Sequence, residues 1–453
     1  MHPGVVAAGA AALVFAALLF LPAVLNGEDI YWHIAAGRWT LENYAVLRID
    51  PFSYTYAGHL WATQDWLAEV LMALAYIGDG WSGLLLLFAA AAALAAGIVA
   101  WHVSRRLGGL WLPVVLILSF ACAAFGLAAQ PGLLALPLFT VWTSGLIAAS
   151  EEGRAPSFKL LPVMVLWANL EPGFLVGLIV LAVLGLEAGL HARGVRRWSV
   201  FAGLAVIAAL LTPYGVEGLF HAARLVAAPL YWNLTNLGLV STLAFAATAA
   251  LLVLGIKRQP VAPLRIILLL WLLFMALLQM RNQMLIAVAM PIVLAAPLAA
   301  ALRATAEETR RRSRAVLFPL AAIAILAAVR LMLPFERGDG EATPASAFAQ
   351  VPEELSRSPV FNERAFGGYL IFNNVRPFID SRTGLYGRTF QDRYARMVSP
   401  DKALLETTLS RNHVRWTILA ANDPAVGSMD TMANWHRLYA DRWAVVHVRN
   451  DVR

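Results

Sequence analysis

Charged residues and cysteine are both scarce in this chain of 453 residues. Only 14% of the residues are Asp, Glu, Lys or Arg, whereas 60% are hydrophobic and the mean hydropathy is +0.66. Ordinary soluble domains carry roughly a quarter charged residues, so the composition excludes a single soluble enzyme. The one cysteine, Cys122, lies in an apolar run; an intramolecular disulfide is therefore excluded, which is compatible with any compartment.

Zinc-binding spacings and a basic patch are also missing. No pair of His or Cys residues has the spacing of a structural zinc site. The net charge is +7, but residues 336–453, with 15 Lys or Arg and 14 Asp or Glu, contribute only +1 of it. The remaining positive charge lies in short loops between apolar segments, which argues against nucleic acid as a partner.

The few charges are unevenly distributed. Residues 1–335 hold only 20 Lys or Arg and 14 Asp or Glu, whereas the much shorter stretch 336–453 has the charge density of a normal globular domain. We therefore expect a membrane domain over 1–335, with a long first outer loop over 27–81, and a small soluble α/β domain over 336–453.

Apolar segments fill the first part of the chain. A bilayer core needs about twenty apolar residues per helix, and somewhat fewer where short helices pack against protein. About eleven segments qualify, which predicts an all-α polytopic membrane bundle, and the shorter stretch 66–78 is expected to be re-entrant or interfacial. The segments are 4–26, 82–104, 108–126, 132–149, 159–170, 173–190, 198–214, 237–256, 264–279, 283–302 and 315–334.

Basic residues mark one side of these segments. With the N-terminus inside, the inner loops contain fifteen Lys or Arg and the outer loops only four. The positive-inside rule therefore predicts a multi-pass membrane protein with a cytoplasmic N-terminus. An odd number of helices then places the C-terminal domain outside the cytoplasm, which is the periplasm if the membrane is a bacterial inner membrane. The inner residues are Arg105, Arg106, Arg154, Lys159, Arg193, Arg196, Arg197, Lys257, Arg258, Arg265, Arg303, Arg310, Arg311, Arg312 and Arg314, and the outer ones are Arg38, Arg48, Arg224 and Arg281.

The outer side holds the polar candidates. Glu28 and Asp29 directly follow the first apolar segment and precede a stretch with the pattern of an amphipathic interfacial helix. His33 lies one turn after Asp29, where it could share the same helix face. Arg38 follows in the same stretch. The inner loops are short, so substrates are expected to approach from the outer leaflet or the periplasm.

Two further residues of this loop have more than one interpretation. Asp50 is expected either to pair with Arg38 and hold the shape of the loop, or to contact substrate. Asp65 precedes the apolar stretch 66–78, where it is either an N-cap or part of the substrate site.

Several motifs resemble a known superfamily. Residues 29–39 read D-x-x-W-H-x-A-x-G-R-W and are followed by DPFSYT and W-L-x-E. Together with the acidic pair and about eleven spans, this resembles the GT-C membrane glycosyltransferases, which include protein O-mannosyltransferases, aminoarabinose transferases and oligosaccharyltransferase catalytic subunits. It is most similar to a poorly characterised bacterial GT-C-like group. Further matches are Trp167–Leu170, Thr212–Gly215, Arg281–Asn282 and the tail pattern over Phe361–Gly387.

The chain departs from this group in two places. After W-A-N-L the group usually has His-Gly, where this chain has Glu171-Pro172. The usual His-Glu before Trp66 is replaced by Gln64-Asp65. Both departures change acid or base groups on the outer face, so we expect the donor or the acceptor to differ from those of the group.

The resemblance implies an inverting transferase that uses a polyprenyl-phosphate-linked sugar. Asp29 would then be the catalytic base, although it would also suit the N-terminus of a helix. Glu171 would be a second acid or, with Asp29, a ligand of a divalent cation; its alternative is a solvated loop residue. Arg281 would hold the donor phosphate, and so would Arg224 with less support; otherwise both anchor helix ends.

The C-terminal part predicts short mixed elements. Strands are expected in VRWTILAA and WAVVHVR, a strand followed by a turn in RPFIDSR, strand-like or short helical pieces in PVFNE and YLIFN, and helices over 388–397 and 401–411. A polar cluster is expected either to act as a lid over the membrane domain or to form a buried Asp–Arg pair that holds a turn. Its members are Asp380, Arg382, Tyr386 and Tyr394.

These observations favour a membrane glycosyltransferase with a lipid-linked sugar donor and a lipid or envelope glycan as acceptor. Two rivals are an envelope lipid transporter or flippase and a GT-C-like scaffold without activity. No internal repeat and no series of intramembrane charges supports transport. Asp29 at the acidic position of the superfamily argues against an inactive scaffold.

Overall fold

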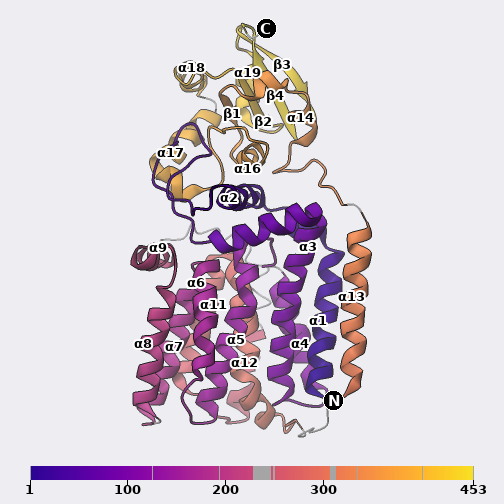
Figure 1. The fold of residues 1–453 in the computed structure, drawn as a ribbon, viewed down its shortest axis with the longest axis vertical. Coiled ribbons are helices and arrows are strands. Elements are labelled where there is room, and N and C mark those ends of the chain that lie inside the picture. Colours follow the sequence, from indigo (N-terminus) through magenta and orange to yellow (C-terminus); the bar gives the residue numbers. More distant parts are fainter. Residues whose placement is uncertain are drawn as a thin grey trace. The chain divides into compact units, whose positions relative to one another are not determined.

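The chain forms two compact units in the computed structural model (Figure 1). Met1–Val24 and Ser82–Pro334 make up the first, called here the helical unit, and Leu25–Trp81 and Phe335–Arg453 make up the second, the mixed unit. The structure describes all residues except Met1, Phe125, Arg193, 228–245, 248–249, Leu252, 307–312, Pro334, Pro400 and 452–453.

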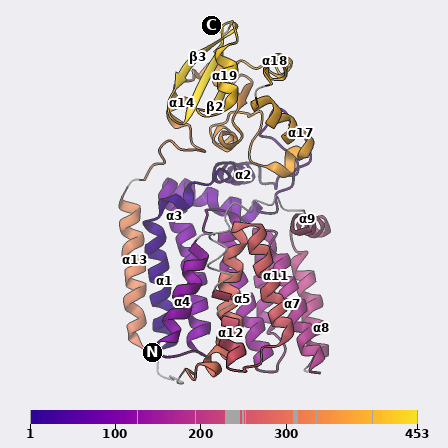
Figure 2. The ribbon, with the colours of Figure 1, turned by 180° about the vertical axis from the view of Figure 1, so that it is seen from behind.

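The helical unit is built from apolar helices rich in Ala and Leu. Its elements are α1 (Pro3–Leu19), the second part of α3 (Trp66–Ser104), α4 (Trp111–Ala124), α5 (Pro131–Glu151), α6 (Leu161–Leu170), α7 (Phe174–Leu190), α8 (Val195–Ala209), α9 (Gly215–Ala227), α11 (Pro263–Leu278), α12 (Gln283–Ala301) and α13 (Leu317–Met332). Among them α12 packs against α4, α5 and α11, and α1 packs against α13 (Figures 1 and 2).

Four described helices are long and apolar enough to cross a membrane, as judged by length and composition. They are Trp66–Ser104, Pro131–Glu151, Met280–Ala301 and Arg314–Met332. The other apolar helices have 10–17 residues, fewer than the roughly twenty that a bilayer core requires. The predicted apolar segments do contain helices, but the count of about eleven spans is not confirmed.

Some predictions from the sequence concern residues that the structure does not describe. Most of the predicted helix over 237–256 lies outside the described residues, and so do Arg193 and Arg310–Arg312 of the basic inner loops. The orientation in the membrane stays a prediction that rests on the loop charges.

A break inside α3 coincides with the boundary between the two units. Asp79 and Gly80 have non-helical backbone angles, and the φ of +54° at Gly80 is one that glycine adopts readily. The sequence separates the stretch 66–78, which is predicted to be re-entrant or interfacial, from the apolar segment 82–104. The structure makes them two helices that meet at this kink. The charge distribution groups residues 27–81 with the first 335, whereas the fold groups them with the tail.

The mixed unit combines the first outer loop with the C-terminal part. Its elements are α2 (Ile30–Asn43), the first part of α3, α14 (Ala345–Ala349), α15 (Glu353–Ser356), β1 (Val360–Asn362), α16 (Gly367–Phe372), α17 (Thr383–Val398), α18 (Lys402–Arg411), β2 (Trp416–Ala420), α19 (Pro424–Asp430), β3 (Trp435–Ala440) and β4 (Ala444–Arg449). The strands form one sheet in the order β1-β2-β4-β3. The β1–β2 pair is parallel, and the β2–β4 and β3–β4 pairs are antiparallel.

Apolar side chains cover both faces of this sheet. Successive strand residues point to opposite faces, so Val360 belongs to one core with α14 and α16, whereas Phe361 belongs to the other with α17, α18 and α19. This explains why the central strands read as continuous apolar runs. The expected α/β character of the tail, with strands β2 and β4 and helices α17 and α18, is confirmed. PVFNE contains strand β1, and YLIFN forms the short helix α16.

Close backbone contacts join α2 to its neighbours. A Cβ atom on Gly37 would lie 1.9 Å from the carbonyl oxygen of Glu69 in α3, and one on Gly368 would lie 2.7 Å from the carbonyl oxygen of Glu28. Trp32, Ala36, Leu47 and Ile371 form a small apolar core between α2 and α16. Glycine therefore allows the first outer loop to pack tightly against the tail.

Candidate active site

Asp29 lies directly before α2, and its carboxylate accepts two hydrogen bonds through a single oxygen. Trp32 Nε1 donates to Asp29 Oδ1 over 2.9 Å, and Ser381 Oγ donates to the same atom over 2.5 Å. Among the described residues no donor contacts Asp29 Oδ2. Asp29 is the N-cap residue of α2, but its side chain makes no capping hydrogen bond to the helix backbone. Its position suits the N-terminus of a helix, so both interpretations of Asp29 stay predictions.

Glu28 is held by a residue of the tail. Arg364 Nη1 lies 2.9 Å from Glu28 Oε1, with both side chains about one-third exposed. Burial raises the pKa of the Glu28 carboxyl, while the Arg364 guanidinium opposes this rise. Arg364 also interacts electrostatically with Asp29, the residue next to Glu28 in the sequence.

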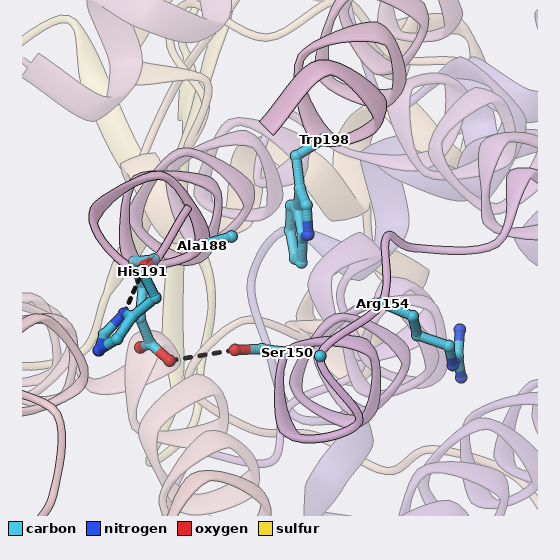
Figure 3. A pocket seen from close by; sticks show the side chains of 7 residues that line it. Ser150, Arg154, Ala188, His191 and Trp198 are labelled. Atoms are coloured by element: carbon cyan, nitrogen blue, oxygen red, sulfur yellow. Dashed lines mark hydrogen bonds between the residues drawn. The ribbon is translucent and has the colours of Figure 1, made fainter. Parts of the chain in front are cut away.

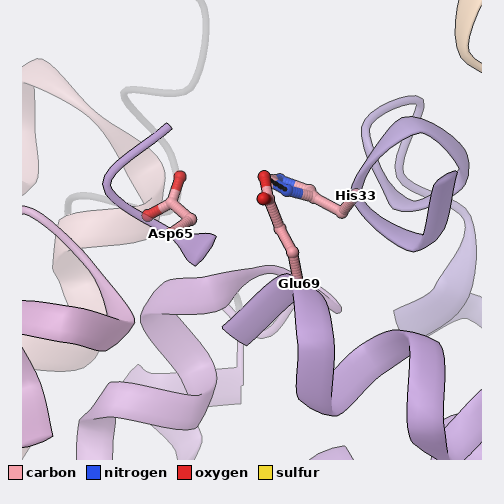
Figure 4. Close-up of side chains that lie close together, drawn as sticks. All are labelled: His33, Asp65 and Glu69. Atoms are coloured by element: carbon pink, nitrogen blue, oxygen red, sulfur yellow. Dashed lines mark hydrogen bonds and ion pairs between the residues drawn. The ribbon is translucent and has the colours of Figure 1, made fainter. Parts of the chain in front are cut away.

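His33, Asp65 and Glu69 form a compact group (Figure 4). His33 Nδ1 lies 3.2 Å from Glu69 Oε1, which also accepts a 2.8 Å hydrogen bond from Thr63 Oγ1. Burial alone would lower the pKa of His33, but the hydrogen bond and the negative charge of Glu69 raise it. Within the described part of the chain, this is the group of three whose ligand atoms lie close enough for one metal ion.

Arg38 and Asp50 do not pair with each other. The Arg38 guanidinium lies over the rings of Tyr76 and Phe372, 5.1 and 4.8 Å from their centres. Asp50 Oδ1 instead lies 2.8 Å from Arg382 Nη1, with both side chains buried. The expected Arg38–Asp50 pair is wrong because aromatic rings from the loop and the tail attract the Arg38 cation.

The polar cluster of the tail is a buried Asp–Arg pair. Arg382 Nη2 lies 2.6 Å from Asp380 Oδ2, and Tyr386 donates its hydroxyl hydrogen to the same oxygen over 2.7 Å. Tyr394 instead donates to the carbonyl oxygen of Asn362. Because Arg382 bridges Asp380 and Asp50, the pair connects the tail to the first outer loop and favours a structural role over a lid.

Glu171 and Arg281 lie in the helical unit. Glu171 follows α6, and its Oε2 accepts a 3.3 Å hydrogen bond from Trp167 Nε1. The positive charge of Arg281 interacts with this carboxylate, although its Nε donates to Gln279. Arg224 is exposed on α9. The structure thus brings Glu171 and Arg281 into one electrostatic environment, while their roles stay predictions.

A small pocket of the helical unit lies near the C-terminal end of α7, whereas Glu171 precedes the beginning of this helix. It is lined by residues at the ends of α5 and α7 and at the beginning of α8, where Ser150 donates to Glu187 over 3.0 Å and His191 contacts the Glu187 carbonyl (Figure 3). Arg265 from α11 pairs with Glu187 at 2.8 Å. We assign these contacts to helix packing, because the acid and the base neutralise each other.

Sequence reasoning missed three residues of the candidate site. Ser381 and Arg364 come from the tail and reach the acids of the first outer loop. Glu69 is the last residue of the W-L-x-E pattern, but the sequence analysis did not name it as a candidate site residue. A carboxylate that interrupts the apolar run after Trp66 was the available signal for Glu69.

Comparisons with known proteins identify no family. No family model matches the chain, and no curated protein matches it. Among solved structures, the chain is similar to the Archaeoglobus fulgidus oligosaccharyltransferase in its apo form, with 13% sequence identity and a TM-score of 0.44. The similarity covers 91% of this chain and 69% of that chain. At this distance it carries no argument about activity, which has to come from the residues themselves.

Proposed function

We propose that the protein is an inverting membrane glycosyltransferase. It transfers a sugar from a polyprenyl-phosphate carrier to a lipid or cell-envelope glycan at the outer face of the bacterial inner membrane. The observation that carries the proposal is the Asp29 carboxylate, whose Oδ1 is held by Trp32 and Ser381 while Oδ2 has no donor among the described residues. The sequence resemblance to GT-C enzymes supports the same residue.

The arrangement of Asp29 suits a general base. Two donors on Oδ1 orient the carboxylate, and Oδ2 is left to take a proton. In the reaction the acceptor hydroxyl oxygen bonds to the anomeric carbon as the bond from that carbon to the phosphate oxygen breaks. The hydroxyl proton goes to Asp29, and polyprenyl phosphate leaves with the bonding electrons.

Negative charge develops on the leaving phosphate and calls for cations. Arg281, for which the sequence predicts this role, and Arg364, next to Glu28 and Asp29, are the residues we assign to it. Glu171 is proposed as an auxiliary acid. Helices long and apolar enough for a membrane support a lipid-linked donor rather than a soluble nucleotide sugar.

The test compares purified full-length wild type with Asp29→Asn in detergent. Asparagine keeps an oxygen for the Trp32 and Ser381 hydrogen bonds but cannot take a proton, so the rate should fall by about 10²–10⁴-fold. Glu42→Gln is the matched control, because Glu42 is an exposed acid of the same helix α2. Extracted cell lipids are added, and lipid-linked sugars and products are followed by mass spectrometry.

The outcomes separate the proposal from its rivals. Consumption of a polyprenyl-phosphate sugar with formation of a glycosylated product, by wild type and Glu42→Gln but not by Asp29→Asn, supports a transferase. Binding of the same lipid by all three proteins without conversion contradicts it. Vesicle assays of lipid movement would then distinguish a flippase from an inactive scaffold.

A further inference from the structure

The group formed by His33, Asp65 and Glu69 is built from two separate segments. His33 lies in α2, whereas Asp65 and Glu69 lie just before and within the first turn of α3 (Figure 4). One ligand atom of each residue lies within 4.8 Å of the others. His33 and Glu69 are both buried, so these groups do not belong to a solvated acidic surface.

One carboxylate oxygen of Glu69 is buried without a hydrogen-bond partner in the described part of the chain. Glu69 is 0% exposed, and its Oε1 is occupied by Thr63 and His33. Its Oε2 is also buried and has no hydrogen-bond partner among the described residues. Burying a carboxylate oxygen without a partner costs free energy, and such atoms in native proteins commonly face an ion or a water molecule.

We propose that His33, Asp65 and Glu69 bind a divalent transition-metal ion such as Zn²⁺ or Mn²⁺. One imidazole nitrogen and two carboxylates are a ligand set that such ions accept. With bonds of about 2.0–2.2 Å, two ligand atoms on one ion are about 3–4 Å apart, and His33 Nδ1 and Glu69 Oε1 already meet this condition at 3.2 Å. A charge of +2 balances both carboxylates when His33 is neutral.

The surrounding fold holds the ligands in place. Gly37 brings α2 into backbone contact with Glu69, which fixes the distance between the two segments. Thr63 donates to a ligand carboxylate, as residues around metal centres commonly do. The His33 ring lies against the indole of Trp32, with ring centres 3.6 Å apart. The ion would therefore join α2, which begins beside Asp29, to the beginning of α3.

This metal site goes beyond the proposed transfer reaction, and its test needs no sugar donor. Full-length protein in detergent is stripped with a chelator, dialysed against Mn²⁺ or Zn²⁺ and analysed by Mn²⁺ electron paramagnetic resonance and by elemental analysis. Wild type is expected to bind one equivalent, and Glu69→Gln and His33→Gln should weaken binding by about tenfold or more. Glu42→Gln, which changes an exposed acid of α2, should bind like wild type.

Thermal unfolding provides a second measurement. An ion that binds only the folded protein raises the Tm, so both metals should stabilise wild type and Glu42→Gln more than Glu69→Gln. If Glu69→Gln does not fold, Asp65→Asn replaces it, because Asp65 is less buried. The proposal is overturned if stripped wild type takes up no metal, or if the ligand variants bind it as tightly as wild type does.

Discussion

Ser381 donates a 2.5 Å hydrogen bond to Asp29 Oδ1, although the two residues are 352 positions apart in the sequence. The tail thus supplies a direct partner of the candidate base within the mixed unit. Trp32 donates to the same oxygen from one turn further along α2. The carboxylate is therefore oriented by one local donor and one donor from the tail.

We predict that Ser381→Ala lowers kcat and leaves KM nearly unchanged. Loss of this hydrogen bond lets the carboxylate rotate but removes no contact that we assign to the substrate, so we expect a decrease of about tenfold, the equivalent of one hydrogen bond to a charged group. Steady-state kinetics on the lipid-linked donor measures this. Ser381→Thr keeps a hydroxyl and should recover most of the rate; equal losses in both variants would contradict a positioning role.

The crossing of α2 and α3 gives a prediction about stability. Alanine at Gly37 would place Cβ 1.9 Å from the Glu69 carbonyl oxygen and 2.8 Å from Ala73 Cβ. The two helix backbones would have to separate, so we expect Gly37→Ala to cost about 3 kcal/mol or more. Denaturant unfolding of the detergent-purified protein measures the change.

Gly78→Ala is the matched control for this substitution. Gly78 lies in α3, the other helix of this crossing, and no atom of the described residues lies within 4 Å of the Cβ that alanine would add. Alanine favours the helix by up to about 1 kcal/mol, so this variant should be as stable as wild type or slightly more so. If both substitutions destabilised the protein equally, the close contact between Gly37 and Glu69 would not explain the effect of Gly37→Ala.

Helices and strands that a short apolar pattern in the sequence specifies were predicted well. Apolar runs indicated the helices of the helical unit, and apolar strand patterns indicated β2 and β4. The segment of β1 was expected to be either strand-like or a short helix. Strand β3 was missed because WHRLYA is mostly exposed and has no apolar alternation. The strand expected in RPFIDSR is wrong: Asp380 and Arg382 pair with each other there, and the backbone forms no ladder.

From the sequence, the candidate site was predicted only for the residues that lie close together along the chain. Glu28, Asp29 and His33 stand out because they lie close together after an apolar segment. Their partners Ser381 and Arg364 lie more than three hundred positions away, and no periodicity reports such a contact. Arg38 was paired with the wrong residue for the same reason, since Phe372 and Arg382 reach the first outer loop only in the folded chain.

Replacement of Arg382 should strongly destabilise the mixed unit. Its guanidinium pairs with both Asp380 and Asp50, and all three side chains are almost fully buried. Arg382→Met removes the cation and leaves two buried carboxylates, for which we expect a cost of about 3–5 kcal/mol. The free energy of unfolding, followed by tryptophan fluorescence in denaturant, measures this because Trp61 lies against the guanidinium.

An exposed ion pair provides the control for Arg382. Arg357 pairs with Glu353 one helix turn away, and both side chains are more than three-quarters exposed. Arg357→Met should change the free energy of unfolding by no more than about 0.5 kcal/mol. If Arg382→Met were as mild as this, Asp50 and Asp380 would have other means of neutralisation and the bridge would not hold loop and tail together.

Asp423 makes stability depend on pH in a direction that is unusual for a carboxylate. Burial raises its pKa from 3.8 to about 6, and the nearby carboxylate of Glu363 adds to the rise. Between about pH 4 and pH 6 the folded protein therefore keeps a proton that the unfolded chain releases. This contribution to stability is fully present below pH 4 and is lost as the pH rises to about 6.

Asp423→Asn should therefore raise the Tm by a few °C at pH 7 and leave it nearly unchanged at pH 4. Asparagine still accepts the hydrogen bond from the Ala425 backbone nitrogen at the beginning of α19, but it carries no charge to bury. Thermal unfolding at both pH values measures the difference, with Asp401→Asn as the control at an exposed N-cap, that of α18. An equal shift of Tm at both pH values would mean that the substitution acts through the helix cap, because only the ionised form of Asp423 carries the penalty of burial.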